Sequence, residues 1–142
     1  MGAEPSVRVF VDANVLFSSC KPRSAMRRLI LALAKHGAAV GSQYVLAEVE
    51  ANLRAKRQEW LPNWPKIRSG LDIQTKRAGV RVPGLVEKDL PVLQAAFHAD
   101  CTHLVTGDQK HFGRWMGKKL HQVKLVSPHD LAVELTELGW RI

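Results

Sequence analysis

An almost unbroken apolar run at residues 7–11, VRVFV, ends at Asp12 and constrains the fold more than any other feature of this sequence. A short run of Val and Phe is typical of a strand buried on both faces, and such strands are usually parallel strands covered by helices. Asp12 would then lie at the carboxyl end of the strand, where ligands bind in open α/β sheets. The alternative is that Asp12 only caps the next helix.

The rest of the chain alternates between helix and strand patterns. Helix patterns cover residues 23–37, 42–58 and 89–99, strand patterns cover 38–41, 102–106 and 122–126, and a last helix begins at Ser127 with Pro128 in its first position. Prolines and glycines break residues 59–84, where we expect short helices and a third strand. These patterns predict a three-layer α/β/α sandwich around a parallel sheet of four or five strands.

The composition favours one globular domain over residues 1–142 with reduced cysteines. With 142 residues, 46% hydrophobic, the chain has the size of a single domain. No stretch approaches the roughly 20 apolar residues of a membrane span, and residues 1–6 carry no charged segment followed by an apolar one. We therefore expect a cytoplasmic protein, in which Cys20 and Cys101 are structural thiols rather than a disulfide.

The formal charge is +8, the sequence pI is about 9.9, and the Lys and Arg residues are spread through the whole chain. Such a charge favours a polyanionic partner, with nucleic acid as the obvious class. A basic surface that only keeps the protein soluble is the alternative, and the charge alone does not separate the two.

Three more acids are expected near Asp12. Asp108 follows the strand pattern at 102–106, so it shares the carboxyl edge of the sheet with Asp12. Glu48 lies in the second turn of the helix that leaves the second strand and is flanked by apolar residues, so we expect its side chain to point inward. Asp89 opens the helix that contains Pro91, near the same edge.

Each acid alone could be a helix cap, a turn residue or a half-buried helix acid. Four carboxylates at one edge of a basic protein would repel one another, however, unless cations neutralise them. Carboxylate oxygens suit Mg²⁺ or Mn²⁺, which are commonly shared with substrate phosphates. The pattern therefore predicts metal-assisted hydrolysis of phosphodiester bonds in nucleic acid, without a covalent protein intermediate.

The motifs around these acids resemble those of the PIN domains, in particular the stand-alone PIN proteins of bacterial toxin-antitoxin pairs. The similar segments are VFVDANVL at 9–16, SQYVLAEVEANL at 42–53 and EKDLPVLQAAFHADCTHLVTGDQKHF at 87–112. Their order and spacing make the resemblance more specific than any one motif. It implies a PIN-like fold, an RNA substrate and an antitoxin partner, and it leaves open whether the chain forms a homodimer.

By the same resemblance, Asp12, Glu48, Asp89 and Asp108 are the catalytic and metal-binding acids, with Asn14 and Thr106 as supporting polar residues. Glu50 competes with Glu48, but it has Arg54 at i+4 for a surface pair. Asp100 competes with Asp89, but it falls before the strand at 102–106 and hence at the opposite end from Asp108.

Basic residues near these motifs are candidates for RNA phosphate contacts, with a solvated helix face as the alternative. They are Lys21, Arg23, Arg27, Arg28, Arg54, Lys56, Arg57 and Lys110.

Two other functions compete with a ribonuclease. A phosphatase-like α/β hydrolase would use Asp12 as a nucleophile and would carry a second acid two residues later, where this chain has Asn14. A catalytically silent RNA- or partner-binding domain would have no use for four mutually repelling acids.

Overall fold

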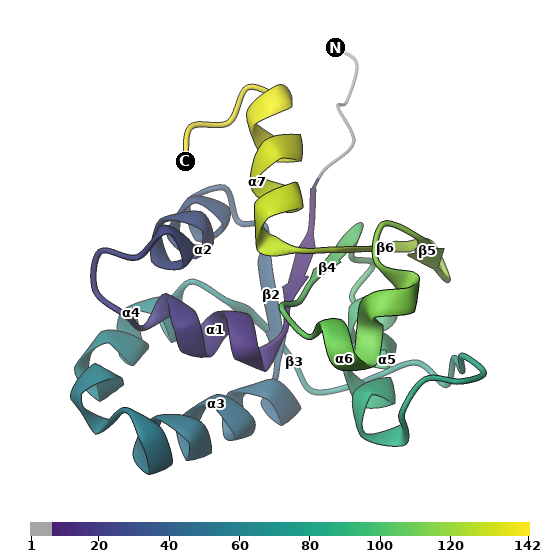
Figure 1. Cartoon of the computed structure of the whole chain (residues 1–142), viewed down its shortest axis with the longest axis horizontal. Helices are drawn as coiled ribbons and strands as arrows, with labels where there is room; N and C mark the ends of the chain where they lie inside the picture. Colours follow the sequence, from purple (N-terminus) through teal and green to yellow (C-terminus); the bar gives the residue numbers. More distant parts are fainter. Residues whose placement is uncertain (1–6) are drawn as a thin grey trace.

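A six-stranded sheet forms the centre of the computed structural model, which describes residues 7–142 (Figure 1). The expectation about an export signal at residues 1–6 lies outside the described residues. The strand order is β3-β2-β1-β4-β6-β5, and the strands are β1 (Val9–Val11), β2 (Ala39–Ser42), β3 (Asp72–Gln74), β4 (His103–Val105), β5 (Lys119–Leu120) and β6 (Val123–Val126). Five strands run parallel, as predicted, and the two-residue β5 adds an unpredicted antiparallel edge.

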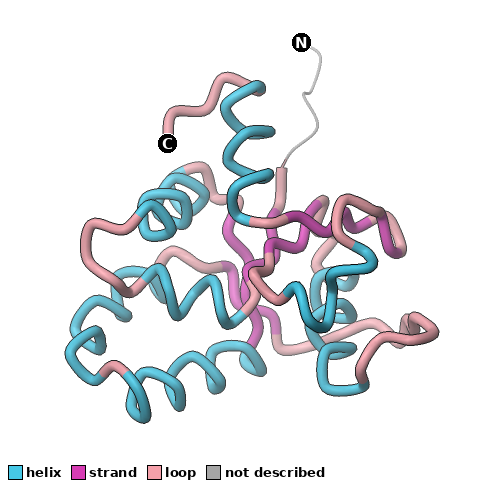
Figure 2. Tube along the Cα trace, viewed as in Figure 1, coloured by secondary structure: helices cyan, strands magenta, loops and turns pink. Residues whose placement is uncertain are grey.

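Helices cover the sheet on both sides, as the three-layer prediction requires. They are α1 (Ala13–Ser19), α2 (Ala25–Lys35), α3 (Gln43–Lys56), α4 (Trp64–Ser69), α5 (Leu90–His98), α6 (Gln109–Phe112) and α7 (Pro128–Glu137), with short 3-10 helices at Gln58–Asn63, Glu87–Asp89 and Gly113–Trp115. In Figure 1, α1 to α4 lie to the left of the central strands and α5 and α6 to the right. Figure 2 shows how short the strands are compared with the surrounding helices.

Polar caps define where two of these helices begin. The hydroxyl of Ser42 accepts a hydrogen bond from the backbone N–H of Val45, and that of Ser127 accepts one from Asp130. These are also the two residues at which the sequence patterns predict that the helices begin. The short helix α1 was not predicted, because the first expected helix was at 23–37, where the structure has α2.

The register of β1 and β4 positions the residues that follow them. All three residues of each strand are buried, and Val11 pairs with Val105. The backbone N–H of Asp12 donates to the carbonyl of Val105 at 3.0 Å. Asp12 and Thr106 therefore emerge side by side at the carboxyl edge of the sheet.

Two further expectations concern membranes and cysteines. None of the described helices is long and apolar enough to cross a membrane. Cys20 and Cys101 are free and buried, and burial raises the pKa of their thiols to about 11 and about 12. Both thiols are therefore held in the unreactive protonated form, as expected for structural cysteines.

Candidate functional site

The four predicted acids line one cavity of about 70 Å³ at the carboxyl edge of the sheet. Each comes from a different segment, near the start of α1, α3, α5 and α6, and these helix starts lie close together below the strands in Figure 1. The lining residues are Asp12, Asn14, Tyr44, Glu48, Lys88, Asp89, Val92, Asp108 and His111. The fold thus brings together all four acids that the sequence analysis selected.

Asp12 both caps α1 and faces the cavity, so the two interpretations of this residue are compatible. Its Oδ1 accepts a hydrogen bond from the backbone N–H of Ala13 at 2.8 Å. The pKa of its carboxyl is raised to about 6, chiefly by burial and in smaller part by the charges of Glu48 and Asp89, against the lowering effect of the hydrogen bonds from Thr106 and Ala13. Asp12 therefore lies where a negative charge is costly unless a cation approaches it.

Thr106 and Asn14 hold Asp12 in place. The Thr106 hydroxyl is fully buried and donates to Asp12 Oδ2 at 2.8 Å, while its oxygen accepts from the backbone N–H of Asp108 at 3.0 Å. Asn14 Nδ2 donates to Asp12 Oδ2 at 3.3 Å, and Asn14 Oδ1 accepts from the backbone N–H of Gly107 at 2.9 Å. These contacts join the ends of β1 and β4 into one polar network.

Asp89 and Asp108 differ in what their side chains do. Asp108 Oδ1 caps α6 by accepting from the backbone N–H of His111 at 3.0 Å. Asp89 precedes α5, but its side chain makes no capping hydrogen bond. Burial raises the pKa of the Asp89 carboxyl, and the charge of Asp108 adds to that effect against the opposing influence of His111 and Lys88. A purely structural cap therefore does not explain Asp89.

Glu48 lines the cavity, but its side chain is exposed, so the expectation that it points inward is wrong. Its position on α3 turns it toward the open mouth of the cavity, where water still reaches it. Glu50 lies outside the cavity lining: its Oε2 accepts from Trp64 Nε1 at 3.0 Å and lies 3.8 Å from Arg68 Nε. The expected partner of Glu50, Arg54, is not among its ion pairs in the described part of the chain.

Asp100, the other competing acid, is exposed in the turn before β4 and takes no part in the cavity. It lies at the amino end of the strand whose carboxyl end leads to Asp108. This is the position that the sequence analysis assigned to it.

His111 is a potential metal-binding residue of the cavity that was not predicted from the sequence. Its Nδ1 lies 2.8 Å from Asp108 Oδ2 and 3.1 Å from Asp89 Oδ2. The signal that could have found it is its position three residues after Asp108, since the side chain of a helix cap lies close to the third residue of the helix that it caps.

The donor set at this cavity suits a divalent cation. Neither His111 Nδ1 nor Asp89 Oδ2 has a hydrogen-bond partner among the residues that the structure describes, although both atoms are buried. One ligand atom each from Asp89, Asp108 and His111 lie within 4.8 Å of one another. Carboxylate oxygens and an imidazole nitrogen at this spacing could coordinate one ion, with Asp12 and Glu48 on the adjoining walls.

A wider groove of about 480 Å³ continues from the acids along α1. It shares Asn14, Glu48 and Asp108 with the small cavity and extends past Ser18 to Met26, on α2. Lys21 and Arg23 lie in the segment that joins α1 to α2 and are exposed. The groove therefore connects the acids with α1 and α2, whose connecting segment carries two of the basic residues expected to contact RNA.

Most of the predicted RNA-binding side chains are free to face solvent. Lys21, Arg23, Arg28, Arg54, Lys56, Arg57 and Lys110 are exposed. Arg27 is half-buried, and its Nη1 donates to the backbone carbonyls of Ser19 and Asn63, both at 3.2 Å. The guanidinium of Arg27 thus connects segments of the fold, and this makes it the least accessible of the eight.

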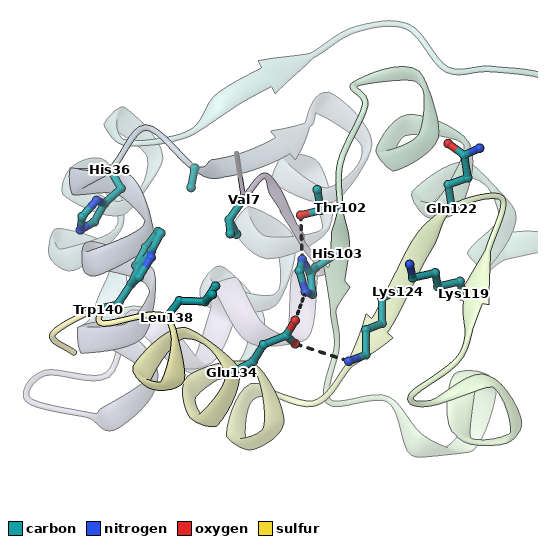
Figure 3. Close-up of a pocket in the computed structure, with 11 residues that line it drawn as sticks. Val7, His36, Thr102, His103, Lys119, Gln122, Lys124, Glu134, Leu138 and Trp140 are labelled. Carbon is teal, nitrogen blue, oxygen red and sulfur yellow. Dashed lines mark hydrogen bonds and ion pairs between the residues drawn. The ribbon is translucent and has the colours of Figure 1, made fainter. Parts of the chain in front are cut away.

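A larger cavity of about 810 Å³ opens at the other edge of the sheet, but its Glu134 carboxylate is already paired with His103 and Lys124 (Figure 3). His103 lies between the Thr102 hydroxyl at 2.7 Å and Glu134 Oε1 at 2.9 Å, and Lys124 Nζ lies 3.6 Å from Glu134 Oε2. Burial alone would raise the pKa of the Glu134 carboxyl, but the contacts with His103 and Lys124 lower it below its usual value. Glu134 is the one acid in the lining, so this cavity offers no acid cluster.

No protein-family model matches the sequence, and a comparison with curated proteins finds no match. Solved structures do match. One is the structure of VapBC2 from Rickettsia felis bound to a DNA fragment from its promoter. The two chains are 18% identical, the TM-score is 0.61, and the match covers 85% of this chain and 98% of that one. Another is the structure of PAE2754 from Pyrobaculum aerophilum, with 18% identity and a TM-score of 0.62; the match covers 92% of this chain and 98% of that one. At this identity the likeness concerns the fold, and the chain therefore has the PIN-like α/β fold that its motifs predict.

Proposed function

We propose that this protein is a divalent-metal-dependent ribonuclease that hydrolyses RNA phosphodiester bonds at the four-acid cavity. The observation that carries the proposal is the convergence of Asp12, Glu48, Asp89 and Asp108, from four separate segments, in a protein with a net charge of +8. Carboxylates that lie close together repel one another and therefore favour a bound cation. The positive charge of the rest of the protein favours a polyanion as its partner. The PIN-like fold and motifs support the same function.

The residues of the site would have three roles: binding the cation, orienting a ligand of the cation and binding the RNA phosphates. Asp12, Asp89 and Asp108 would hold the cation, with Glu48 at the exposed mouth. When bound, a divalent cation supplies Lewis-acid activation of water and of the scissile phosphate. Thr106 and Asn14 keep the Asp12 carboxylate oriented through the hydrogen bonds to its Oδ2. Lys110, Lys21 and Arg23 would bind backbone phosphates on either side of the scissile bond.

The two competing functions find less support. Asn14 occupies the position where a phosphatase of the aspartyl type would carry its second acid, and its amide is engaged with Asp12 and Gly107. A silent binding domain would have no reason to keep the Asp12 carboxyl in a place where burial raises its pKa to about 6. Both functions remain outcomes of the experiment below.

The experiment combines a metal-binding and a cleavage measurement on the parent protein. We expect Mn²⁺ or Mg²⁺ to raise the melting temperature, because ligands that bind only the native state stabilise it. We expect a labelled single-stranded RNA to be cut with either ion and to stay intact in EDTA. Binding of RNA without any metal-induced shift or cleavage would support the silent domain, and release of phosphate from a monoester without RNA cleavage would support the phosphatase.

We also propose that the protein is the toxin of a toxin-antitoxin pair that acts on cytoplasmic RNA. The support is the resemblance of its motifs to stand-alone PIN toxins and the fold that it shares with VapBC2. The neighbouring gene tests this role. A short adjacent reading frame whose product binds and silences the protein would support it, and a gene without such a neighbour would favour an RNA-processing enzyme.

A further inference from the structure

His111 is held against two of the acids by its own helix. It is the third residue of α6, and its backbone N–H donates to Asp108 Oδ1 at 3.0 Å. The imidazole approaches the acids as well, and its Nδ1 lies 2.8 Å from Asp108 Oδ2 and 3.1 Å from Asp89 Oδ2. One ring nitrogen thus faces two carboxylates from different segments of the chain.

These short contacts do not satisfy the atoms that make them. His111 Nδ1 and Asp89 Oδ2 are both buried and, within residues 7–142, neither has a partner in the direction that a hydrogen bond requires. A buried polar atom without a partner destabilises the folded state, because it has lost its hydrogen bonds to water. The geometry therefore calls for a further atom between the nitrogen and the two oxygens.

The distances from His111 Nδ1 to the two carboxylate oxygens match those between neighbouring ligands on one ion, and one ligand atom from each of the three residues lies within 4.8 Å of the others. In an octahedral site with ligands about 2.1 Å from the metal, adjacent ligand atoms are about 3.0 Å apart. The observed separations of 2.8 and 3.1 Å lie on either side of this value. A single ion could thus contact His111 Nδ1, Asp108 Oδ2 and Asp89 Oδ2 with little movement of the side chains.

We infer that His111 Nδ1 is a metal ligand and that it makes the centre prefer a transition-metal divalent cation such as Mn²⁺ over Mg²⁺. Mg²⁺ is a hard ion that prefers oxygen ligands, whereas first-row transition ions accept imidazole nitrogen as well. A site built from carboxylates alone would not make this distinction. The inference rests on the metal centre proposed above and adds a nitrogen ligand and an ion preference to it.

Titration calorimetry with Mn²⁺ alone and with Mg²⁺ alone tests the preference. We expect the parent to bind Mn²⁺ more tightly than Mg²⁺, and His111→Gln to weaken Mn²⁺ binding by about tenfold or more while Mg²⁺ binding changes by less than about threefold. His98→Gln is the matched control, because His98 is exposed at the end of α5 and lies outside the cavity lining. It should bind both ions as the parent does.

Pulsed electron paramagnetic resonance of the Mn²⁺-loaded protein provides a second readout, and its decisive signal is measured on the parent. We expect a hyperfine coupling to ¹⁴N that is present in the parent and in His98→Gln and absent in His111→Gln. Mn²⁺ binding without a nitrogen coupling, or tighter Mn²⁺ binding by His111→Gln, would overturn the inference and make His111 a counter-ion that the metal displaces. If the parent binds neither ion, the proposed metalloenzyme fails as a whole, an outcome distinct from the loss of the nitrogen ligand alone.

Discussion

The Thr106 hydroxyl donates a 2.8 Å hydrogen bond to Asp12 Oδ2, across 94 positions of the chain. The hydroxyl oxygen of Thr106 also accepts a hydrogen bond from the backbone N–H of Asp108, so the buried Thr106 side chain connects two of the acids. Because β1 and β4 are neighbours in register, this connection is built into the sheet. The position of the cavity therefore depends on the central strands rather than on flexible loops.

Thr106→Val should damage both the fold and the metal centre. It removes the donor to Asp12 and the acceptor for Asp108, so we expect a loss of about 1 to 3 kcal/mol in the free energy of unfolding and weaker Mn²⁺ binding. Urea unfolding and calorimetry measure the two effects. Thr136→Val is the control, since the exposed Thr136 hydroxyl bonds only within α7. Equal behaviour of the two variants would mean that the link between Asp12 and Asp108 has no energetic role.

Asp12→Asn should change how stability depends on pH in metal-free protein. The Asp12 carboxyl ionises near its usual value of 3.8 when unfolded and at about 6 when folded, so its contribution to stability is complete below pH 4 and is lost as the pH rises through 6. The variant avoids this loss and keeps an oxygen to cap Ala13. Relative to the parent it should gain up to about 3 kcal/mol at pH 8 and nothing at pH 4.

Urea unfolding in EDTA between pH 4 and pH 8 measures this difference. Losses in the hydrogen bonds to Thr106 and Asn14 would reduce the gain but would not depend on pH in the same way. If Asp12→Asn instead loses the same amount of unfolding free energy, relative to the parent, at pH 8 and at pH 4, Asp12 is only a structural cap.

Glu48→Gln and Glu50→Gln should have opposite effects. Glu48 faces the cavity mouth, so its variant should keep its stability and lose metal-dependent cleavage. Glu50 accepts from the buried Trp64 and lies near Arg68, so its variant should lose about 1 kcal/mol of stability and keep cleavage. Thermal unfolding and RNA cleavage, measured on both variants, separate these outcomes. The reverse pattern would mean that Glu50, rather than Glu48, is the acid of α3 that takes part in the reaction.

Lys110→Gln should reduce the dependence of RNA binding on salt. Lys110 is exposed in α6, next to Asp108, whereas Lys119 lies in β5 and lines the cavity at the other edge. In the uncleaving Asp108→Asn background without metal, removal of one phosphate contact should lower the slope of log K against log salt by about 0.7. Lys119→Gln should leave the slope unchanged. Equal slopes for both variants would place the RNA away from α6.

Local patterns predicted the features that depend on neighbouring residues. The strand at β1, the Ser42 and Ser127 caps and the acid after β4 follow from apolar runs and capping chemistry alone. The fold then brings the acids together because parallel strands end at one edge. The gathering of the acids at this edge could therefore be predicted from the sheet order, without knowledge of other distant contacts.

Features that depend on tertiary packing were missed or mistaken. Helix α1 has Val15, Phe17 and two serines, which have modest helix propensity, and the burial of Val15 and Leu16 stabilises it. The hydrogen bond from Trp64 to Glu50 depends on the conformation of the proline-containing segment between them, which could not be predicted from the sequence. The exposure of Glu48 likewise depends on how far α3 projects from the sheet, which its spacing to Val45 and Val49 does not determine.

The most direct test of the account is the single-turnover cleavage rate of a labelled single-stranded RNA in Mn²⁺ by Asp108→Asn, compared with Asp100→Asn. The two variants make the same chemical change at an acid inside the cavity and at an exposed acid outside it. Asn also tolerates the left-handed backbone of Asp100, whose φ is 56°. We predict that Asp108→Asn cuts at least about a hundredfold more slowly than the parent, since it loses metal-assisted stabilisation worth several kcal/mol, and that Asp100→Asn matches the parent. Cleavage by Asp108→Asn at the parent's rate would contradict the assignment of the reaction to this cavity.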